Sequence, residues 1–304
     1  MSVKKRILIF LALTFAITYA YEIFILWPAV VTGSISELAI AAVMLVPAAG
    51  TVMTRLLTKE GFGDMMLAPR FKKNKGLYAA AWLLPAAMCF VGAAIYFLCV
   101  PGMFDKNLTY IISQRAAQGI DITKSQALTA AIGELAVGLV LAPILNFVMC
   151  LGEELGWRGY LLPKLMNKFK ILPSILISGV IWGLWHAPLT LIGHNYGTGY
   201  AGYPYAGIAA MCVFCTFVGS VLTFFTVKSK SVIPAVIVHS VINGISAGGL
   251  LFMRSPELSN PFVGPMPIGI LGGAGIIISG VAMTLVLMRD EKLRKGQTEE
   301  RSVG

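Results

Sequence analysis

The chain has 304 residues, of which 57% are hydrophobic and only 12% are charged, and its mean hydropathy is +0.79. Soluble globular proteins carry about 25% charged residues, so this composition excludes a soluble domain and predicts an integral membrane protein. The net charge of +10 does not indicate a nucleic-acid partner, because the basic residues lie in short clusters between apolar runs.

Eight apolar segments reach the roughly 20 residues that a helix needs to cross a bilayer. They are residues 7–31, 37–57, 77–100, 128–150, 171–192, 206–227, 232–252 and 268–288. The first follows Lys4, Lys5 and Arg6 but is too long for a cleaved signal peptide, so we interpret it as a retained anchor. We predict an all-α integral membrane protein, a bundle of about eight transmembrane helices forming a single polytopic domain over residues 1–304.

The distribution of basic residues predicts the orientation. With the N-terminus in the cytoplasm, 20 of the 24 lysines and arginines fall on the cytoplasmic side, and Lys106, Arg115, Lys124 and Arg254 fall outside. Such an asymmetry is typical of the positive-inside pattern. We therefore predict a multi-pass protein of the cell membrane with both termini cytoplasmic, including a charged tail at 289–304.

Between these spans, residues 105–126 are polar with spaced apolar positions and indicate an interfacial helix or a structured external loop. The five cysteines are an odd number and lie in or beside apolar runs, which argues against a disulfide framework. Cys212 and Cys215 form a C-x-x-C inside an apolar segment, without the surroundings of a redox or zinc motif.

The first polar motif is Glu153-Glu154-x-x-x-Arg158. The predicted topology places it at the cytoplasmic end of the fourth span. On a helix, Glu154 and Arg158 are i,i+4 neighbours and can pair, whereas Glu153 points about 100° away. The pattern leaves Glu153 available for chemistry. A solvated helix end with one charge pair is the simpler interpretation.

Two further motifs lie in later spans. Trp182-x-x-x-His186 is followed by Pro188, and His239 and Asn243 are one turn apart on one helix face. Each histidine also fits a purely structural role, hydrogen-bonded to a neighbouring helix. Together the motifs place a carboxylate, two histidines and an asparagine on three successive spans. We expect them to converge in a cytoplasm-facing intramembrane cavity, where they form a complete set for general-base hydrolysis of an amide.

Glu153 and His186 are predicted at different depths in the membrane. At a rise of about 1.5 Å per residue, His186 lies some 20 Å from the cytoplasmic start of its span, whereas Glu153 is predicted at the cytoplasmic end of the fourth span. We therefore expect the fourth span to tilt, to start late or to bend near Pro143. Asn146 lies on nearly the same helix face as Glu153. For the remaining polar groups Glu22, Glu134 and His194 we expect structural or interfacial roles.

In order and spacing, these motifs resemble those of the CAAX-protease and bacteriocin-processing family of intramembrane proteases, over about residues 137–249. The resemblance implies that Glu153 and His186 activate the attacking water, that His239 and Asn243 stabilise the oxyanion, and that Glu154 and Arg158 support the site. Trp182 stands where the family more often has phenylalanine. The implied function is an intramembrane endopeptidase acting on a membrane-associated peptide or protein.

Two alternatives to this function are open. The first is a non-catalytic immunity or regulatory protein that binds another membrane protein. The second is a transporter, which the absence of an inverted repeat makes the weaker alternative. The same site would also suit a zinc metalloprotease with Glu153, His186 and His239 as ligands. We expect no metal, because the chain lacks H-E-x-x-H and Asn243 is a poor zinc ligand. The sequence predicts neither the substrate nor the oligomeric state.

Overall fold

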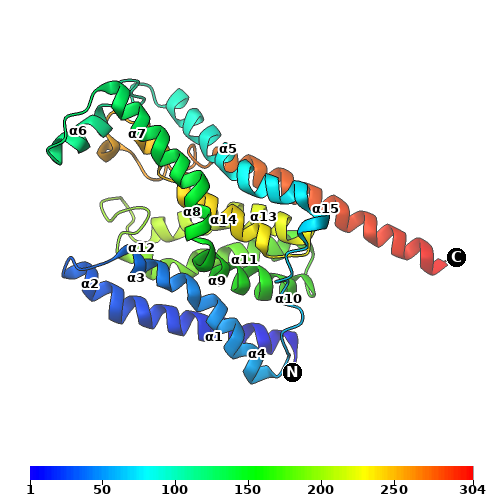
Figure 1. The fold of residues 1–304 in the computed structure, drawn as a ribbon. Helices are drawn as coiled ribbons and strands as arrows, with labels where there is room; N and C mark the ends of the chain where they lie inside the picture. Colours follow the sequence, from blue (N-terminus) through cyan, green and yellow to red (C-terminus); the bar gives the residue numbers. More distant parts are fainter. Residues whose placement is uncertain (304) are drawn as a thin grey trace. The chain divides into compact units, whose positions relative to one another are not determined.

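The computed structural model describes the backbone of residues 1–303 and the side chains of residues 1–293, so the side chains of the predicted tail beyond Leu293 lie outside the described residues. The regular secondary structure of the described residues is helical, with loops between the helices and no β-strand (Figure 1). One isolated bridge among these residues joins Phe104 and Met253. The all-α fold is confirmed. The predicted tail from 289 onward continues the last helix, α15 (Ala274–Val303).

Among the residues that the structure describes, six helical stretches are long and apolar enough to cross a membrane. They are Val3–Val31, Glu37–Thr58, Lys75–Cys99, Lys124–Leu145, Tyr205–Ser229 and Ile233–Phe252. They match six of the eight predicted spans. The other two predicted spans are also helical, as the shorter apolar α11 (Ile171–Trp185) and as α15. Apolar runs become helices because a backbone in lipid must satisfy its own hydrogen bonds.

The chain forms two compact units. The first comprises Met1–Leu77, Val148–Val236 and the stretch that starts at Ser279. Its helical elements before the fourth predicted span are α1 (Val3–Tyr21), η1 (Glu22–Leu26), α2 (Trp27–Val31), α3 (Glu37–Ala42), η2 (Val43–Leu45), α4 (Val46–Thr58) and η3 (Phe71–Lys73). Those after it are α9 (Phe147–Gly156), η5 (Trp157–Leu161), α10 (Leu162–Met166), α11, α12 (Ala187–Leu191) and α13 (Tyr205–Ser229).

The second unit comprises Tyr78–Phe147 and Ile237–Ile278. Its elements are α5 (Lys75–Cys99), α6 (Thr109–Ala117), α7 (Lys124–Ala136), η4 (Val137–Leu141), α8 (Ala142–Leu145), most of α14 (Ile233–Ile245), η6 (Gly248–Phe252) and η7 (Pro256–Leu258). The polar segment 105–126 forms α6 and the start of α7. Leu108 and Ile111 pack there against Ala127 and Ala131.

Glycines set the helix contacts of the first unit. On α11, a Cβ at Gly179 would lie 2.5 Å from the Cα of Thr216, and one at Gly183 would lie 2.3 Å from the Cα of Cys212. No side chain fits such distances, so α11 packs with its backbone directly on α13. Small residues that let helix backbones approach are typical of membrane bundles. The close contact fixes the end of α11, where His186 follows.

Candidate active site

The first motif lies in the middle of a helical run rather than at the end of a span. The helix predicted for 128–150 ends at Leu145 with Asn146 as its C-cap, and α9 begins at Phe147. The chain then stays helical through η5 and α10 to Met166. The prediction that the fourth span extends to 150 and carries the motif at its end is therefore wrong. A bend near Pro143 was one of the three alternatives expected, and the helix does change character there: the π-helical η4 ends at Leu141, and Pro143 is the second residue of the short α8.

Helix α9 is held against η2 and the first turn of α4. A Cβ at Gly152 would lie 2.5 Å from the carbonyl oxygen of Met44, and one at Gly156 would lie 2.4 Å from Cβ of Pro47. These two glycines flank the paired glutamates, so any side chain there would push α9 away. The small residues thus fix the backbone from which Glu153 and Glu154 project.

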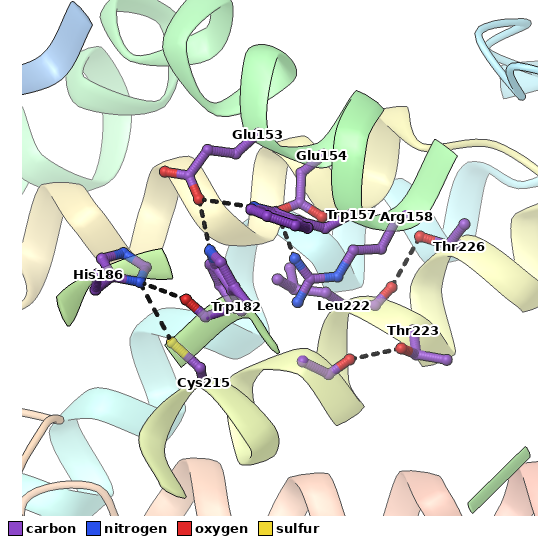
Figure 2. Close-up of polar contacts among 11 residues, drawn as sticks. Glu153, Glu154, Trp157, Arg158, Trp182, His186, Cys215, Leu222, Thr223 and Thr226 are labelled. Carbon is purple, nitrogen blue, oxygen red and sulfur yellow. Dashed lines mark hydrogen bonds and ion pairs between the residues drawn. The ribbon is translucent and has the colours of Figure 1, made fainter. Parts of the chain in front are cut away.

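Glu153 is 2% exposed and its carboxylate is hydrogen-bonded by two tryptophans. Its Oε2 accepts from Nε1 of Trp182 at 2.7 Å and from Nε1 of Trp157 at 3.3 Å (Figure 2). A buried carboxylate needs such donors. Burying even a neutral polar group without a hydrogen bond costs on the order of 2–7 kcal/mol, and burying a charged group costs more. Indole N–H groups supply the donors without adding a charge that would neutralise the glutamate.

Glu154 and Arg158 form the predicted i,i+4 ion pair. Glu154 is fully buried, and Nη1 of Arg158 donates to its Oε1 at 3.1 Å. The Arg158 guanidinium also lies 4.1 Å from the centroid of the Trp182 ring, within cation–π range. One arginine therefore pairs with the second glutamate and packs on the residue that binds the first.

Trp182 also contacts His186. Nδ1 of His186 lies 2.9 Å from the carbonyl oxygen of Trp182, one helical turn earlier. A hydrogen bond to a carbonyl requires a proton on Nδ1, so in the neutral ring Nε2 is the acceptor nitrogen. Trp182 thus bonds Glu153 through its indole and His186 through its backbone (Figure 2). The structure brings these two predicted residues onto one scaffold.

The N-terminal helix anchors the chain immediately before His186. Nε1 of Trp185 donates to Oγ1 of Thr18 at 2.7 Å, and the Tyr19 hydroxyl donates to the carbonyl of Leu184 at 2.7 Å. The ring of Trp185 meets His186 edge-on, with centroids 4.8 Å apart. The first predicted span therefore supports the histidine, although it contains no recognisable motif.

His239 and Asn243 lie one turn apart on α14, as predicted. The side chain of His239 is buried, at 6% exposure, and Asn243 is exposed. Both belong to the second unit, whereas Glu153 and His186 belong to the first. Their shared role in oxyanion binding stays a prediction.

No three His, Cys, Asp or Glu side chains among the described residues gather into a group that could hold a metal ion. The zinc alternative needs Glu153 and His186 from one unit and His239 from the other. Both the metal-free site and its zinc alternative remain predictions.

Three further residues contact the site, and none of the three site motifs specifies them. Trp157 donates to Glu153, Thr18 anchors Trp185, and Sγ of Cys215 lies 3.8 Å from Nδ1 of His186. Trp157 is the i+4 neighbour of Glu153, so helical spacing could have identified it. Thr18 and Cys215 come from distant helices, and only their occurrence as small polar residues in apolar spans was a signal. All five cysteines are free thiols.

The other polar residues singled out have varied surroundings. Glu22 is 2% exposed, and neither carboxylate oxygen has a hydrogen-bond partner among the described residues. Glu134 is half-exposed and lies 3.9 Å from Arg115. His194 lies in the turn after α12, and Asn146 caps α8. None of these contacts reaches Glu153 or His186.

A buried charge network flanks the motif helix on its C-terminal side. Oε2 of Glu60 lies 3.0 Å from Nζ of Lys164 and 3.2 Å from Nη1 of Arg6, and the Tyr160 hydroxyl donates to Oε1 at 2.5 Å. Burial by itself would raise the pKa of Glu60. The hydrogen bonds from Tyr160 and Lys164 and the positive charges of Lys164 and Arg6 outweigh burial and lower that pKa.

Comparison with known proteins identifies this part of the chain. Residues 127–245, which contain Glu153, His186, His239 and Asn243, match the family model described as type II CAAX prenyl endopeptidase Rce1-like. This central region of the chain is similar to that family. The resemblance inferred from the three motifs is thereby confirmed, with the core placed at 127–245 where the motifs indicated about 137–249.

A curated relative agrees with this assignment. The CAAX prenyl protease 2 of Methanococcus maripaludis is 32% identical over 94 residues. The matched stretch covers 30% of this chain and 34% of the relative, so the chain spans about a third of the length of that protein. The matched region thus lies within a multi-pass, all-helical membrane protein, with further helices on both sides of it.

Proposed function

We propose that the protein is an intramembrane endopeptidase that hydrolyses a peptide bond in a membrane-associated peptide or protein. The observation that carries the proposal is the double contact of Trp182, which bonds the carboxylate of Glu153 and Nδ1 of His186 within a CAAX-protease core. A buried carboxylate beside an oriented imidazole is the arrangement that general-base activation of water requires.

In the proposed reaction, Glu153 accepts a proton from water while His186 orients that water. The resulting hydroxide attacks the carbonyl carbon of the scissile bond, and the carbonyl oxygen becomes an oxyanion. His239 and Asn243 donate hydrogen bonds to this oxyanion, following the family resemblance. The C–N bond then breaks, and the proton held by Glu153 passes to the departing amine.

Glu154 and Arg158 support the site without touching substrate. Their ion pair holds Arg158 on the face of Trp182, whose indole binds Glu153. We propose that the pair keeps the indole N–H directed at Glu153. Arg158 is 1% exposed, so it acts from within the protein.

We propose that hydrolysis proceeds without a metal. The support is that the chain lacks H-E-x-x-H and that Asn243 lies one turn from His239, because asparagine is a poor zinc ligand but a good donor to an oxyanion. Metal analysis of purified active protein tests this. Stoichiometric zinc, with activity lost on chelation and restored by readdition, would instead make Glu153, His186 and His239 the ligands.

We propose that both termini and the basic loops face the cytoplasm of the cell. The support is the 20-to-4 asymmetry of lysine and arginine across the predicted spans. Cysteine labelling in a cysteine-free background tests it. A cysteine placed at Arg70 should be modified only after the membrane is permeabilised, and labelling from outside intact cells would refute the orientation.

Trapping tests the activity and identifies the substrate. Glu153→Gln removes the proposed base but keeps a side chain that fits the indole pocket, so the variant should bind substrate without cleaving it. Mass spectrometry of protein purified from membranes should reveal intact partners on Glu153→Gln that are absent from wild type. Glu134→Gln, at a half-exposed glutamate in the other unit, is the matched control. Identical partners on all three proteins would contradict endopeptidase activity.

A further inference from the structure

A pocket of about 490 Å³ is lined in part by Arg158, the ion-pair partner of Glu154. It is enclosed by the loop that follows α4, by the end of α10 and by the end of α13. All of these segments belong to the first unit. By the predicted topology they meet at the cytoplasmic membrane surface, where α4 and α13 end.

The walls of this pocket are fixed by hydrogen bonds between distant segments. The amide N–H of Val232 donates to the carbonyl of Met66 at 3.0 Å, and Nδ2 of Asn74 donates to the carbonyl of Ser229 at 3.2 Å. Met66, Arg70 and Lys230 adopt left-handed backbone conformations, with φ of 53°, 50° and 55°. Non-glycine residues adopt this conformation rarely, so the loop is held in a defined shape.

The charge around the pocket is unbalanced. Arg70 and Lys230 line it, are exposed, and have no ion-pair partner among the described residues. The one carboxylate in the lining, Asp64, is paired with the buried Arg55 at 2.6 Å. Two unneutralised cations at the opening of a pocket attract an anion.

The remaining lining is apolar. Leu67, Leu162, Pro163, Met166 and Val227 contribute to the walls between the two cations and Arg158. A soluble anion such as phosphate gains nothing from this surface. An amphiphile with an anionic head and a hydrocarbon chain satisfies both parts, and basic pockets between helix ends on the cytoplasmic side are suited to anionic lipid headgroups.

We propose that this pocket binds the phosphate headgroup of an anionic membrane lipid, with Arg70 and Lys230 as the contacting cations and the apolar wall receiving the start of an acyl chain. The site is separate from the peptide-cleavage chemistry. Through Arg158 it borders the ion pair with Glu154 and the ring of Trp182. A bound lipid would therefore pack against the support of the catalytic glutamate.

Lipid binding to the full-length protein tests the proposal. The protein is placed in nanodiscs of phosphatidylcholine with added phosphatidylglycerol, and the lipids it retains are quantified by native mass spectrometry. The wild type should retain phosphatidylglycerol preferentially. The double variant Arg70→Gln, Lys230→Gln should lose about thirtyfold of that preference, because two basic residues near an anionic surface contribute roughly 1 kcal/mol each and about 1.4 kcal/mol is a factor of ten.

The matched control is Lys72→Gln, Lys73→Gln, which removes the same charge from exposed lysines on η3 that do not line the pocket. It should retain the preference. A neutral variant, Leu67→Trp, narrows the pocket at an exposed position and should reduce retention without altering charge. Equal losses in both double variants would show general surface attraction and overturn the site.

The source of the anion is tested in parallel. Inorganic phosphate should raise the melting temperature of the wild type far less than phosphatidylglycerol does. Equal effects would assign the site to a free anion instead of a lipid. Displacement of phosphatidylglycerol by a peptide with a free C-terminal carboxylate, but not by its amide, would assign the pocket to a peptide and refute the lipid proposal.

Discussion

At the scale of single residues, Trp182 is the residue that bonds both Glu153 and His186. Trp182→Phe keeps an aromatic ring beneath Arg158 and removes the N–H that binds Glu153 at 2.7 Å. Hydrogen bonds to charged groups contribute about 1.5–3 kcal/mol, so kcat should fall roughly tenfold or more while KM stays constant. Steady-state kinetics on the trapped substrate measures this. Trp27→Phe, at a position 45% exposed, should leave kcat unchanged. Unchanged activity in Trp182→Phe would remove the indole from the mechanism.

Breaking the ion pair between Glu154 and Arg158 should lower the stability of the protein as well as its activity. Arg158→Ala leaves the fully buried Glu154 without its ion-pair partner, which typically costs about 3–5 kcal/mol. Its melting temperature in detergent should fall sharply. Glu153→Gln should keep the wild-type melting temperature and abolish only cleavage. Equal melting temperatures for wild type and Arg158→Ala would contradict the supporting role of the pair.

Some of these residue contacts were within reach of the sequence. Helical spacing predicts the pairing of Glu154 with Arg158 and the separate direction of Glu153, and the structure has the pair. The bond from Trp182 to Glu153 joins residues 29 positions apart on different helices. Its prediction requires the packing of α9 against α11, which depends on side-chain fit rather than on any periodicity.

At the scale of helices, the glycines of α11 decide where His186 lies. Gly183→Ala places a Cβ 2.3 Å from the Cα of Cys212, so α11 must move away from α13. Overpacking of this kind costs about 1–3 kcal/mol, and the melting temperature should fall together with activity. Gly133→Ala is the control, because a Cβ there meets nothing within 4 Å. It should be neutral or slightly stabilising, since alanine favours helix. Equal behaviour of the two variants would refute the close packing of α11 on α13.

Helix identity was predictable and helix ends were less so. The apolar runs alone predict the spanning helices, because lipid offers no hydrogen-bond partners and the backbone N–H and C=O groups must therefore bond to one another. The end at Leu145 was not predicted, since only Asn146 interrupts the apolar run, which resumes at Phe147 and continues to Leu151. The interruption there makes the motif helix α9 a separate element.

At the scale of the whole molecule, the Glu60 network predicts an acid-dependent stability. Its interactions with Tyr160, Lys164 and Arg6 lower the pKa of Glu60 below the unfolded value. The network therefore stabilises the fold at pH values above the unfolded pKa, and this contribution is lost as the pH falls through the lowered pKa. Melting temperature should decline as the pH falls below the ordinary range of a glutamate.

Glu60→Gln isolates the contribution of this carboxylate. The variant should melt at a lower temperature than wild type at neutral pH, and the difference should shrink on acidification. Circular dichroism melts from neutral to acidic pH measure both curves. Glu257→Gln, on the short η7 in the other unit, serves as the control for removing one carboxylate. Parallel curves for wild type and Glu60→Gln would contradict the assignment.

The central claim is that Glu153 drives peptide-bond cleavage, and profiling of new protein termini tests it most directly. Membranes from cells lacking the protein are supplied with wild type, Glu153→Gln or Glu134→Gln at equal levels, and the termini of membrane-associated proteins are compared by mass spectrometry. Wild type and Glu134→Gln should generate the same new termini, and Glu153→Gln should generate none of them. The same termini with Glu153→Gln as with wild type would contradict Glu153 as the base that activates water.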